Sequence, residues 1–398
     1  MDREAILAEA QRMKDWLVAL RRELHRVPEP GWEEFETAAL IERELTAMGV
    51  PYERRGTSVV ALVEGRGGGG PRPTVALRAD MDGLPVTEPA GKPYGSAKPG
   101  FMHACGHDAH VTIALGAARF FSARRDELPG NVKILFQPAE ETDGGAERMI
   151  AEGCMENPKV DFILGLHVMP YLPVGRIETK KGSLNGSSTT LKATIRGKGG
   201  HGAYPESAID AVLVGSQAIV ALNTLVSRYV SPLDSAVITV GRAQGGTRSN
   251  IVAEEFGFSA TLRTTSDSLR DLLVGRARAV VENVAAAYGA EGRFEVSYGY
   301  AALVNHDRAV ELVARAAEEI LGPGSVEWKE KPSMGVEDFS FFIKDAPGAF
   351  YHLGCGDAER GRRGPLHSPD FELNEACLPL GVAMQAAATL LYLEENHG

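Results

Sequence analysis

The chain of 398 residues has few cysteines, no long uncharged apolar run and no cluster of basic residues. Its four cysteines are too few for the disulfide framework of a small secreted domain. The opening stretch MDREAILAEAQRMKDWLVALRREL carries charges every few positions, whereas a signal peptide needs about 7–15 unbroken apolar residues. No window approaches the ~18 apolar residues of a membrane span. The sequence therefore predicts a cytoplasmic protein that does not use a membrane.

Basic residues are also outnumbered, with 42 Lys and Arg against 53 Asp and Glu, a net charge of −11. Nucleic-acid binding requires a basic face that neutralises phosphates, so nucleic acid is excluded as the main partner. With 44% hydrophobic and 24% charged residues, the composition is that of an ordinary globular protein and excludes intrinsic disorder. At roughly 150 residues per domain, the length predicts two or three domains.

The first part of the chain alternates short apolar runs with helical patterns. The first 25 residues have apolar side chains at helical spacing and predict one amphipathic helix. Short apolar runs predict strands at residues 74–77, 132–136 and 161–166. A helical pattern at residues 108–124 lies between the first two strands. Strands separated by helices indicate an α/β fold with helices on both faces of a sheet.

Near residue 184 the pattern changes to that of a smaller unit. Strand and helix patterns follow one another in the order βαββαβ, at residues 189–196, 208–229, 236–240, 256–263, 266–288 and 294–300. This order is that of a compact ferredoxin-like unit. The α/β pattern then returns with helices at 308–321 and 374–394. We therefore predict one α/β domain, residues 1–184 and 302–398, interrupted by an inserted domain, residues 185–301.

The densest chemical signal is the segment HACGHDAH, which contains His103, Cys105, His107 and His110. Thiolate and imidazole are the ligands that zinc and similar divalent metals prefer. The segment lies at the start of the predicted helix 108–124, so all four side chains are not expected to bind one ion. The alternative is a histidine-rich helix start with solvated rings.

Three successive predicted strands each lead into ligand-type side chains. Asp80 and Asp82 follow the first strand, the adjacent pair Glu140 and Glu141 follows the second, and His167 follows the third. Loops at the carboxyl ends of strands in an open α/β sheet are where ligands bind. One glutamate can ligate a metal while the other acts as a general base. Each feature alone has an ordinary structural explanation, but chance seldom places all three.

Other polar residues lie in glycine-rich turns and at strand ends. His201 lies in the turn GKGGHGAYP, Asn250 lies in the segment SNIV, and Arg263 ends a predicted strand. Arginine is the side chain best suited to hold a carboxylate through paired hydrogen bonds. His367 lies in the loop GPLHSPD before the last predicted helix. A structural role explains each of these residues equally well when it is taken alone.

Taken together, these segments resemble one family, the dinuclear-metal amidohydrolases that include aminoacylases, hippurate hydrolases, indole-acetyl-amino-acid hydrolases and related carboxypeptidases. The matching strings run in family order along nearly the whole chain: LHR (24–26), RADMDGLP (78–85), HACGHD (103–108), QPAEE (137–141), GLH (165–167), GHGA (200–203), SNIV (249–252), GVEDF (335–339) and LH (366–367). The resemblance implies a zinc-peptidase-like catalytic domain on a mixed sheet, with the ferredoxin-like insert serving as a lid and dimerisation domain.

The resemblance also implies a role for each matching residue. Cys105 would be shared by two divalent metal ions, with His107 and His167 completing one site. Glu141 and His367 would complete the other site.

Further roles follow from the same resemblance. Glu140 would be the general base, and Asp82 would orient a metal ligand, as metal-bound imidazoles generally require. His201 would come from a neighbouring subunit and stabilise the oxyanion. Asn250 and Arg263 would bind the carboxylate of the substrate's amino-acid half.

The chain departs from the wider family at two positions. Many members have His where this sequence has Asp80, and a bridging Asp where it has Cys105. These departures place it in the cysteine-bridged branch, which contains the acyl-amino-acid hydrolases. Thiolate favours zinc, and the carboxylates and imidazoles also accept manganese, cobalt or nickel.

The expected reaction is therefore metal-dependent hydrolysis of the amide bond of N-acyl amino acids to a carboxylic acid and a free amino acid. A dipeptidase or carboxypeptidase acting at the same site and a non-catalytic binder of acylated amino acids are the alternatives. The expected partners are a small acylated amino acid or short peptide and further copies of the chain, as a homodimer or homotetramer.

Overall fold

The computed structural model describes residues 3–67, 72–357 and 364–396, and these divide into two compact units. Unit 1 comprises Met1–Gly182, Asn305–Lys331 and Phe341–Gly398, and unit 2 comprises Ser183–Val304 and Pro332–Ser340. The sequence pattern did not assign the segment Pro332–Ser340 to the inserted domain. The backbone N–H of Gly186 donates to the carbonyl oxygens of Ser333 and Gly335, which holds this segment against unit 2.

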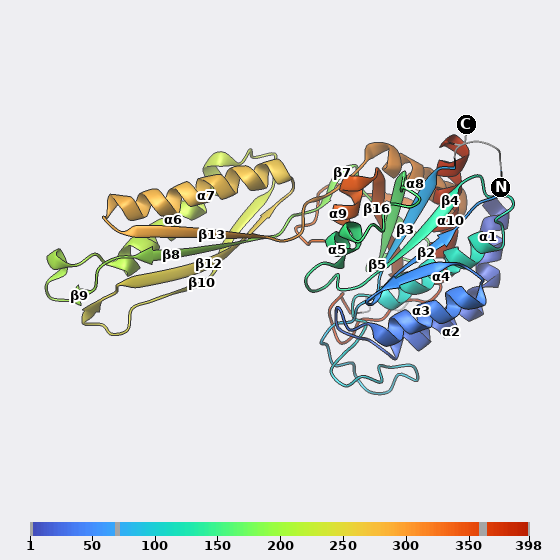
Figure 1. Cartoon of the computed structure of the whole chain (residues 1–398), viewed down its shortest axis with the longest axis horizontal. Coiled ribbons are helices and arrows are strands. Elements are labelled where there is room, and N and C mark those ends of the chain that lie inside the picture. Colours follow the sequence, from blue (N-terminus) through green and yellow to red (C-terminus); the bar gives the residue numbers. More distant parts are fainter. Residues whose placement is uncertain (1–2, 68–71, 358–363, 397–398) are drawn as a thin grey trace. The chain divides into compact units, whose positions relative to one another are not determined.

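Unit 1 is built on an eight-stranded mixed sheet with the order β1-β2-β4-β3-β5-β16-β6-β15 (Figure 1). Its strands are β1 (Tyr52–Arg55), β2 (Ser58–Val63), β3 (Thr74–Asp80), β4 (Asn131–Gln137), β5 (Phe162–Pro173), β6 (Ile177–Thr179), β15 (Val326–Trp328) and β16 (Gly348–Gly356). Strand β3 is parallel to β4 and β5, and β5 is parallel to β16. The carboxyl ends of these central strands therefore meet at one edge of the sheet.

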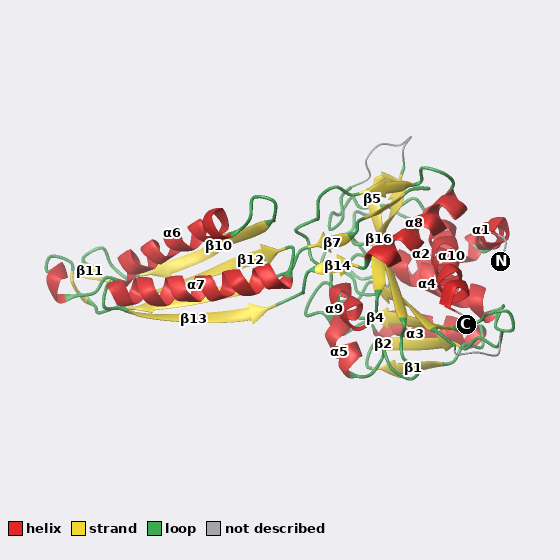
Figure 2. Ribbon diagram, turned by 90° about the horizontal axis from the view of Figure 1, so that it is seen from above, coloured by secondary structure: helices red, strands yellow, loops and turns green. Residues whose placement is uncertain are grey.

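Helices cover both faces of this sheet, as the sequence predicts (Figure 2). They are α1 (Arg3–Arg12), α2 (Lys14–His25), α3 (Phe35–Ala47), α4 (His107–Ser122), α5 (Gly145–Ala151), α8 (Asp307–Leu321), α9 (Phe339–Asp345) and α10 (Cys377–Asn396). Helices α5 and α9 lie on the opposite side from α4 and α10 (Figure 2). Helix α4 is buried along almost its entire length, so the first turn of α4 begins inside the core.

One expectation about the helices was wrong. The single helix predicted for the first 25 residues is two helices, α1 and α2, separated by a turn at Met13. The apolar spacing continues across this turn, so the pattern does not reveal it.

Two helices, α10 and α6 (Ala211–Tyr229), are long and apolar enough to span a membrane by length and composition. Because 83% of the apolar window of α10 is buried, it is a core helix of unit 1.

Unit 2 has the predicted ferredoxin-like order, with an antiparallel sheet arranged β10-β12-β8-β13. Its main strands are β8 (Thr189–Arg196), β10 (Ala236–Gly245), β12 (Glu255–Thr264) and β13 (Glu291–Tyr298). Helices α6 and α7 (Asp267–Ala287) pack side by side on one face of the sheet. Leu191, Ala193 and Ile195 alternate along β8 and contribute to the core beneath these helices. The short strands are β7 (Gly182–Asn185), β9 (Gly200–His201), β11 (Ile251–Val252) and β14 (Leu303–Asn305), and a single 3-10 turn spans Pro205–Ser207.

The contact between α4 and α10 gives a stability prediction. A side chain at Gly116 of α4 would collide with Val382 of α10 and with Leu17 of α2. We expect Gly116→Val to lower the free energy of unfolding by about 1–3 kcal/mol, the usual cost of overpacking. Urea unfolding followed by circular dichroism measures this change.

The matched control is Gly275→Val in α7, where a new Cβ would meet nothing within 4 Å. Because valine is a slightly better helix former than glycine, this variant should be as stable as the wild type or a few tenths of a kcal/mol more stable. Equal losses in both variants would show that the helix packing is not the cause.

Candidate metal centre and active site

The segment between Ala104 and Asp108 turns so that two ligand-type side chains face the same point. Gly106 caps α4 with a φ of 87°, a left-handed conformation that glycine adopts without strain. A Cβ at this position would also lie 2.5 Å from Cγ2 of Val168. Glycine is therefore required between Cys105 and His107 for both conformational and packing reasons.

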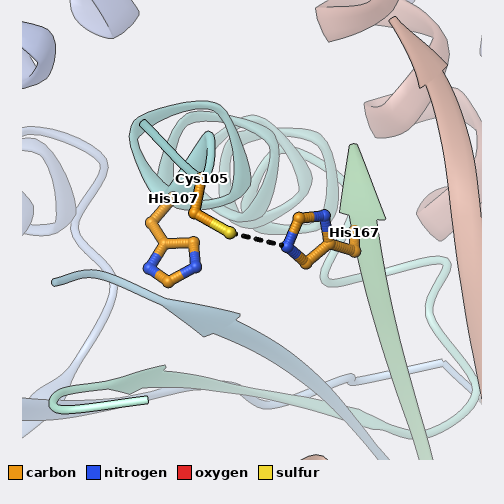
Figure 3. A group of neighbouring side chains, drawn as sticks. All are labelled: Cys105, His107 and His167. Carbon is orange, nitrogen blue, oxygen red and sulfur yellow. Dashed lines mark hydrogen bonds between the residues drawn. The ribbon is translucent and has the colours of Figure 1, made fainter. Parts of the chain in front are cut away.

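Cys105, His107 and His167 form the first group of candidate ligands (Figure 3). Their ligand atoms all lie within 4.8 Å of one another, and each side chain is buried. Sγ of Cys105 is 3.2 Å from Nε2 of His167. Nδ1 of His167 donates to the carbonyl oxygen of Val168 at 2.8 Å, so the Nε2 lone pair faces the sulfur.

The second group shares the same sulfur atom. Nε2 of His367 lies 3.3 Å from Sγ of Cys105 and 3.0 Å from Oε1 of Glu141. The backbone N–H of His367 donates to the carbonyl oxygen of Ala104, which ties its loop to the Cys105 segment. The structure thus brings together the five residues for which the family resemblance implied metal binding, in the same two groups.

Asp82 connects the two groups. Its Oδ1 lies 3.1 Å from Nδ1 of His107, and its Oδ2 accepts a hydrogen bond from the backbone N–H of Glu141 at 2.9 Å. This arrangement holds the His107 ring and the loop of Glu141, both of which carry candidate ligands. With Nδ1 donating to the carboxylate, Nε2 is the nitrogen of His107 that would bind a metal once its own proton is displaced.

The residues fit a bound metal ion. Nε2 of His107 is buried and has no hydrogen-bond partner within the described part of the chain; it lies 3.7 Å from Asp80 and 3.9 Å from Glu141. A buried polar atom without a partner is costly, and a cation between these groups would satisfy it. A thiol, imidazoles and a carboxylate are a suitable donor set for zinc or another borderline divalent ion.

Glu140 is placed to act beside this centre. It is buried, and its carboxylate lies within 4.8 Å of ligand atoms of His107 and Glu141. The preceding residue, Ala139, has a φ of 59°, a left-handed conformation that is strained for a residue with a side chain. Glu34 holds this turn by accepting a hydrogen bond from the Ala139 N–H at 2.8 Å.

The metal-free centre holds protons at neutral pH. Burial, reinforced by Glu141 and Glu140, raises the pKa of the Cys105 thiol well above its usual value. Burial disfavours the charged form of His107, but nearby carboxylates led by Asp80 outweigh it and raise the pKa to about 10. The hydrogen bond to Glu141 raises the pKa of His367. Any metal that binds must displace these protons.

The predicted residues of the inserted domain lie at two places in unit 2. His201 and Asn250 lie beyond the Glu255 end of β12, where the Gly202 N–H donates to the Asn250 carbonyl oxygen. Arg263 lies at the other end of β12, roughly 25 Å away at the usual rise per residue. Within one chain, unit 2 does not bring these residues together.

Two side chains of unit 2 offer hydrogen-bond donors that suit negatively charged groups. Nδ1 of His201 accepts a hydrogen bond from the Ala203 N–H at 3.1 Å, so the proton of the neutral ring is on Nε2, which can donate outward. His201 is exposed, whereas Nη1 of Arg263 is buried without a hydrogen-bond partner in the described structure. An unpartnered guanidinium nitrogen of this kind suits a carboxylate.

Comparison with known proteins identifies the family. Residues 76–390 match the model of peptidase family M20/M25/M40. The chain belongs to this family. It is 39% identical to an IAA-amino acid hydrolase of Arabidopsis thaliana, covering 98% of this chain and 88% of that one. It is 37% identical to the N-acetyl-L-cysteine deacetylase of Bacillus subtilis, covering 92% and 84% respectively.

A solved structure agrees with these relatives. A dinuclear metal-binding peptidase of family M20 from Bacillus subtilis has a TM-score of 0.83 and 31% identity, covering 96% of this chain and 99% of that one. Family membership makes this chain a metal-dependent amidohydrolase, as the sequence predicts. The fold, with its catalytic unit and ferredoxin-like insert, is that of the M20 enzymes.

Two supports of the centre in this M20 enzyme were not predicted from the sequence. Glu34 holds the Ala139 turn but lies far from any motif, and burial raises its pKa to about 7. Asp80 and His110, both among the ligand-type residues that the sequence pointed out, form a hydrogen bond of 2.5 Å with each other, and this pairing was not predicted. The apolar run that ends in Asp80 is the signal that could have found it, because a fully buried strand that ends in a carboxylate requires a partner for it.

The protonated state of the metal-free M20 enzyme leads to a prediction about metal uptake. Because Cys105 and His107 both carry protons at pH 7, the first equivalent of Zn²⁺ should release about two protons per chain. The affinity for Zn²⁺ should rise with pH for the same reason. A pH indicator in weakly buffered, chelator-treated protein measures the release, and Cys105→Ala should release about one proton fewer.

The shifted pKa of His107 also determines how the stability of the metal-free protein changes with pH. The raised pKa of His107 means that its charged ring stabilises the metal-free fold fully below its unfolded pKa of about 6.5. This contribution is lost as the pH rises through about 10. Zn²⁺ binding without proton release would contradict the assignment of protons to these two residues.

Proposed function

We propose that this enzyme hydrolyses the amide bond of N-acyl amino acids and releases a carboxylic acid and a free amino acid. The observation that carries the proposal is a buried glutamate, Glu140, adjacent to two ligand groups that share Cys105. The relatives named as an IAA-amino acid hydrolase and an N-acetyl-L-cysteine deacetylase support this substrate class.

Five residues would hold two divalent ions. Cys105, His107 and His167 would hold one ion, and Cys105, Glu141 and His367 the other. Zinc or manganese is the proposed metal: thiolate favours zinc, and the carboxylates and imidazoles accept manganese, as they also accept cobalt or nickel. Bound metal would supply Lewis acidity, which lowers the pKa of a water molecule and polarises the substrate carbonyl.

The protein's own residues would move the protons. Glu140 would take a proton from the attacking water and deliver it to the departing amine. Nε2–H of His201 would donate to the oxyanion that develops on the scissile carbonyl, a contribution of about 3–4 kcal/mol in comparable sites. Arg263 and Asn250 would bind the carboxylate of the amino-acid half.

We further propose that the enzyme is a homodimer whose inserted domains exchange residues between active sites. A single small carboxylate cannot contact both ends of β12, so Asn250 and Arg263 can act on one substrate only if two chains supply them. Helix α6 also presents an outward face with Leu213 and Val220, 49% and 64% exposed. Strand β10 beside it is an unpaired edge of the sheet. An apolar face and an open edge support association through unit 2.

A peptidase acting on dipeptides is the second candidate function, because the same residues would cleave a peptide bond. Hydrolysis of N-acetyl, N-benzoyl and indole-acetyl amino acids beside dipeptides separates the two activities. A cytoplasmic location is also proposed, and the four cysteines, all free and buried, support it.

The assignment of Glu140 as the general base has a direct test. Glu140→Gln keeps the shape of the side chain but removes its basicity, so turnover of an N-acyl amino acid should fall about 100- to 10,000-fold. Metal analysis should still find the wild-type metal content, because Glu140 is not in either proposed ligand group. A variant that retains wild-type turnover would refute the general-base role, and a chain without turnover on any substrate would favour the non-catalytic binder.

The exchange of His201 between subunits has an independent test. His201→Ala and Glu140→Gln chains should each be inactive alone, because each homodimer lacks one essential group at both sites. Co-expression should restore up to about a quarter of wild-type activity, since half the dimers would be mixed and each mixed dimer has one intact site. Mixed dimers without activity would show that His201 does not act in the neighbouring subunit.

A further inference from the structure

A chain of buried hydrogen bonds runs behind the proposed metal centre. Nε of Arg78 donates to Oε1 of Gln137 at 2.8 Å, and Nη1 of Arg78 donates to Oδ2 of Asp80 at 2.5 Å. Oδ1 of Asp80 lies 2.5 Å from Nδ1 of His110, and Nε2 of His110 lies 2.9 Å from the Val168 backbone nitrogen. All five residues are at most 2% exposed.

The donors and acceptors of this hydrogen-bond chain can be assigned in only one consistent way. The Val168 N–H can only donate, so Nε2 of His110 must be the acceptor. The proton of the neutral ring is then on Nδ1, which donates to Asp80. Arg78 provides the positive charge that compensates the Asp80 carboxylate in a site without solvent.

Val168 connects this chain to a proposed metal ligand. Its N–H is held by His110, and its carbonyl oxygen accepts the Nδ1–H of His167. The second bond fixes the ring so that Nε2 of His167 faces Cys105. The position of the Val168 backbone therefore sets where the His167 ligand atom lies.

Asp80, His107 and His110 also lie close enough to hold a metal of their own. Both nitrogens of His110 are already engaged, one by Asp80 and one by Val168. His110 has no lone pair left for an ion, so these three residues do not form a third site.

We propose that Asp80 and His110 are positioning residues that set the place of His167 and thereby the affinity for the ion held by Cys105, His107 and His167. This rests on the proposed function, since it assumes two bound ions. Asp80 is joined to Gln137 through Arg78, and Gln137 precedes the turn that carries Glu140 and Glu141. The hydrogen-bond chain thus fixes the ends of β3 and β4, and Val168 within β5, relative to the first turn of α4.

The test is a titration of the chelator-treated full chain with Co²⁺, followed by the thiolate–cobalt absorption and by metal analysis after dialysis. His110→Leu removes both polar atoms at similar volume, and it should weaken one of two Co²⁺ equivalents about 10- to 100-fold. His110→Gln keeps an acceptor for Val168 and a donor for Asp80, so it should bind Co²⁺ more nearly like the wild type. Asp80→Asn should weaken binding of the same Co²⁺ equivalent, and it replaces His110→Leu in the test if that variant does not fold.

Asn305→Leu is the matched control. Asn305 is 2% exposed and makes three hydrogen bonds to the backbone of Lys180 and Phe350, none of them to a proposed ligand or to the hydrogen-bond chain from Arg78 to Val168. It should lose stability without losing Co²⁺ affinity. The inference would be overturned if His110→Leu or Asp80→Asn bound both Co²⁺ equivalents as the wild type does, or if Asn305→Leu weakened binding equally. Either result would leave the proposed function standing. A wild-type chain that binds no Co²⁺ would overturn the proposed function and this inference with it.

Discussion

The candidate metal centre depends on the burial of one sulfur atom among imidazole and carboxylate groups. Cys105 is 6% exposed, and nitrogen atoms of His167 and His367 lie within 3.3 Å of it. A neutral thiol could occupy a core without such neighbours, whereas a thiolate in this surrounding requires positive charge. The glycine turn at Gly106, the Asp82 carboxylate and the burial of α4 all keep this sulfur between the two groups of ligands.

Much of the fold follows from the sequence because its signals are local. The predicted strand 189–196 coincides with β8, and the apolar runs at 74–77 and 132–136 are the cores of β3 and β4. The break at Met13 was not predictable, because the apolar spacing is the same on both sides. The segment Pro332–Ser340 joins unit 2 through hydrogen bonds of its backbone, which no side-chain pattern encodes.

The site was predictable to the extent that its residues follow strands. Asp82 and Glu141 come after β3 and β4, whose carboxyl ends lie at one edge of the sheet, where ligands bind. The expectation that His167 follows a strand was wrong, because β5 continues through it to Pro173; a polar side chain interrupts the apolar pattern without ending the strand. His367 was found only through the family resemblance, since its loop carries no periodic signal. Glu34 and the pairing of Asp80 with His110 depend on three-dimensional neighbours from separate elements, which spacing along the chain cannot reveal.

The two ligand groups differ in their access to solvent. Cys105, His107 and His167 are each at most 8% exposed, whereas the side chain of His367 is 53% exposed. An ion beside His367 would therefore exchange with the surrounding solution faster than an ion beside His107, because fewer atoms must move to release it. Two ions held by one sulfur would then have different lifetimes, with the shorter one at the more exposed site. A change in the metal content of the surroundings would then reach the more exposed half of the centre before the buried half.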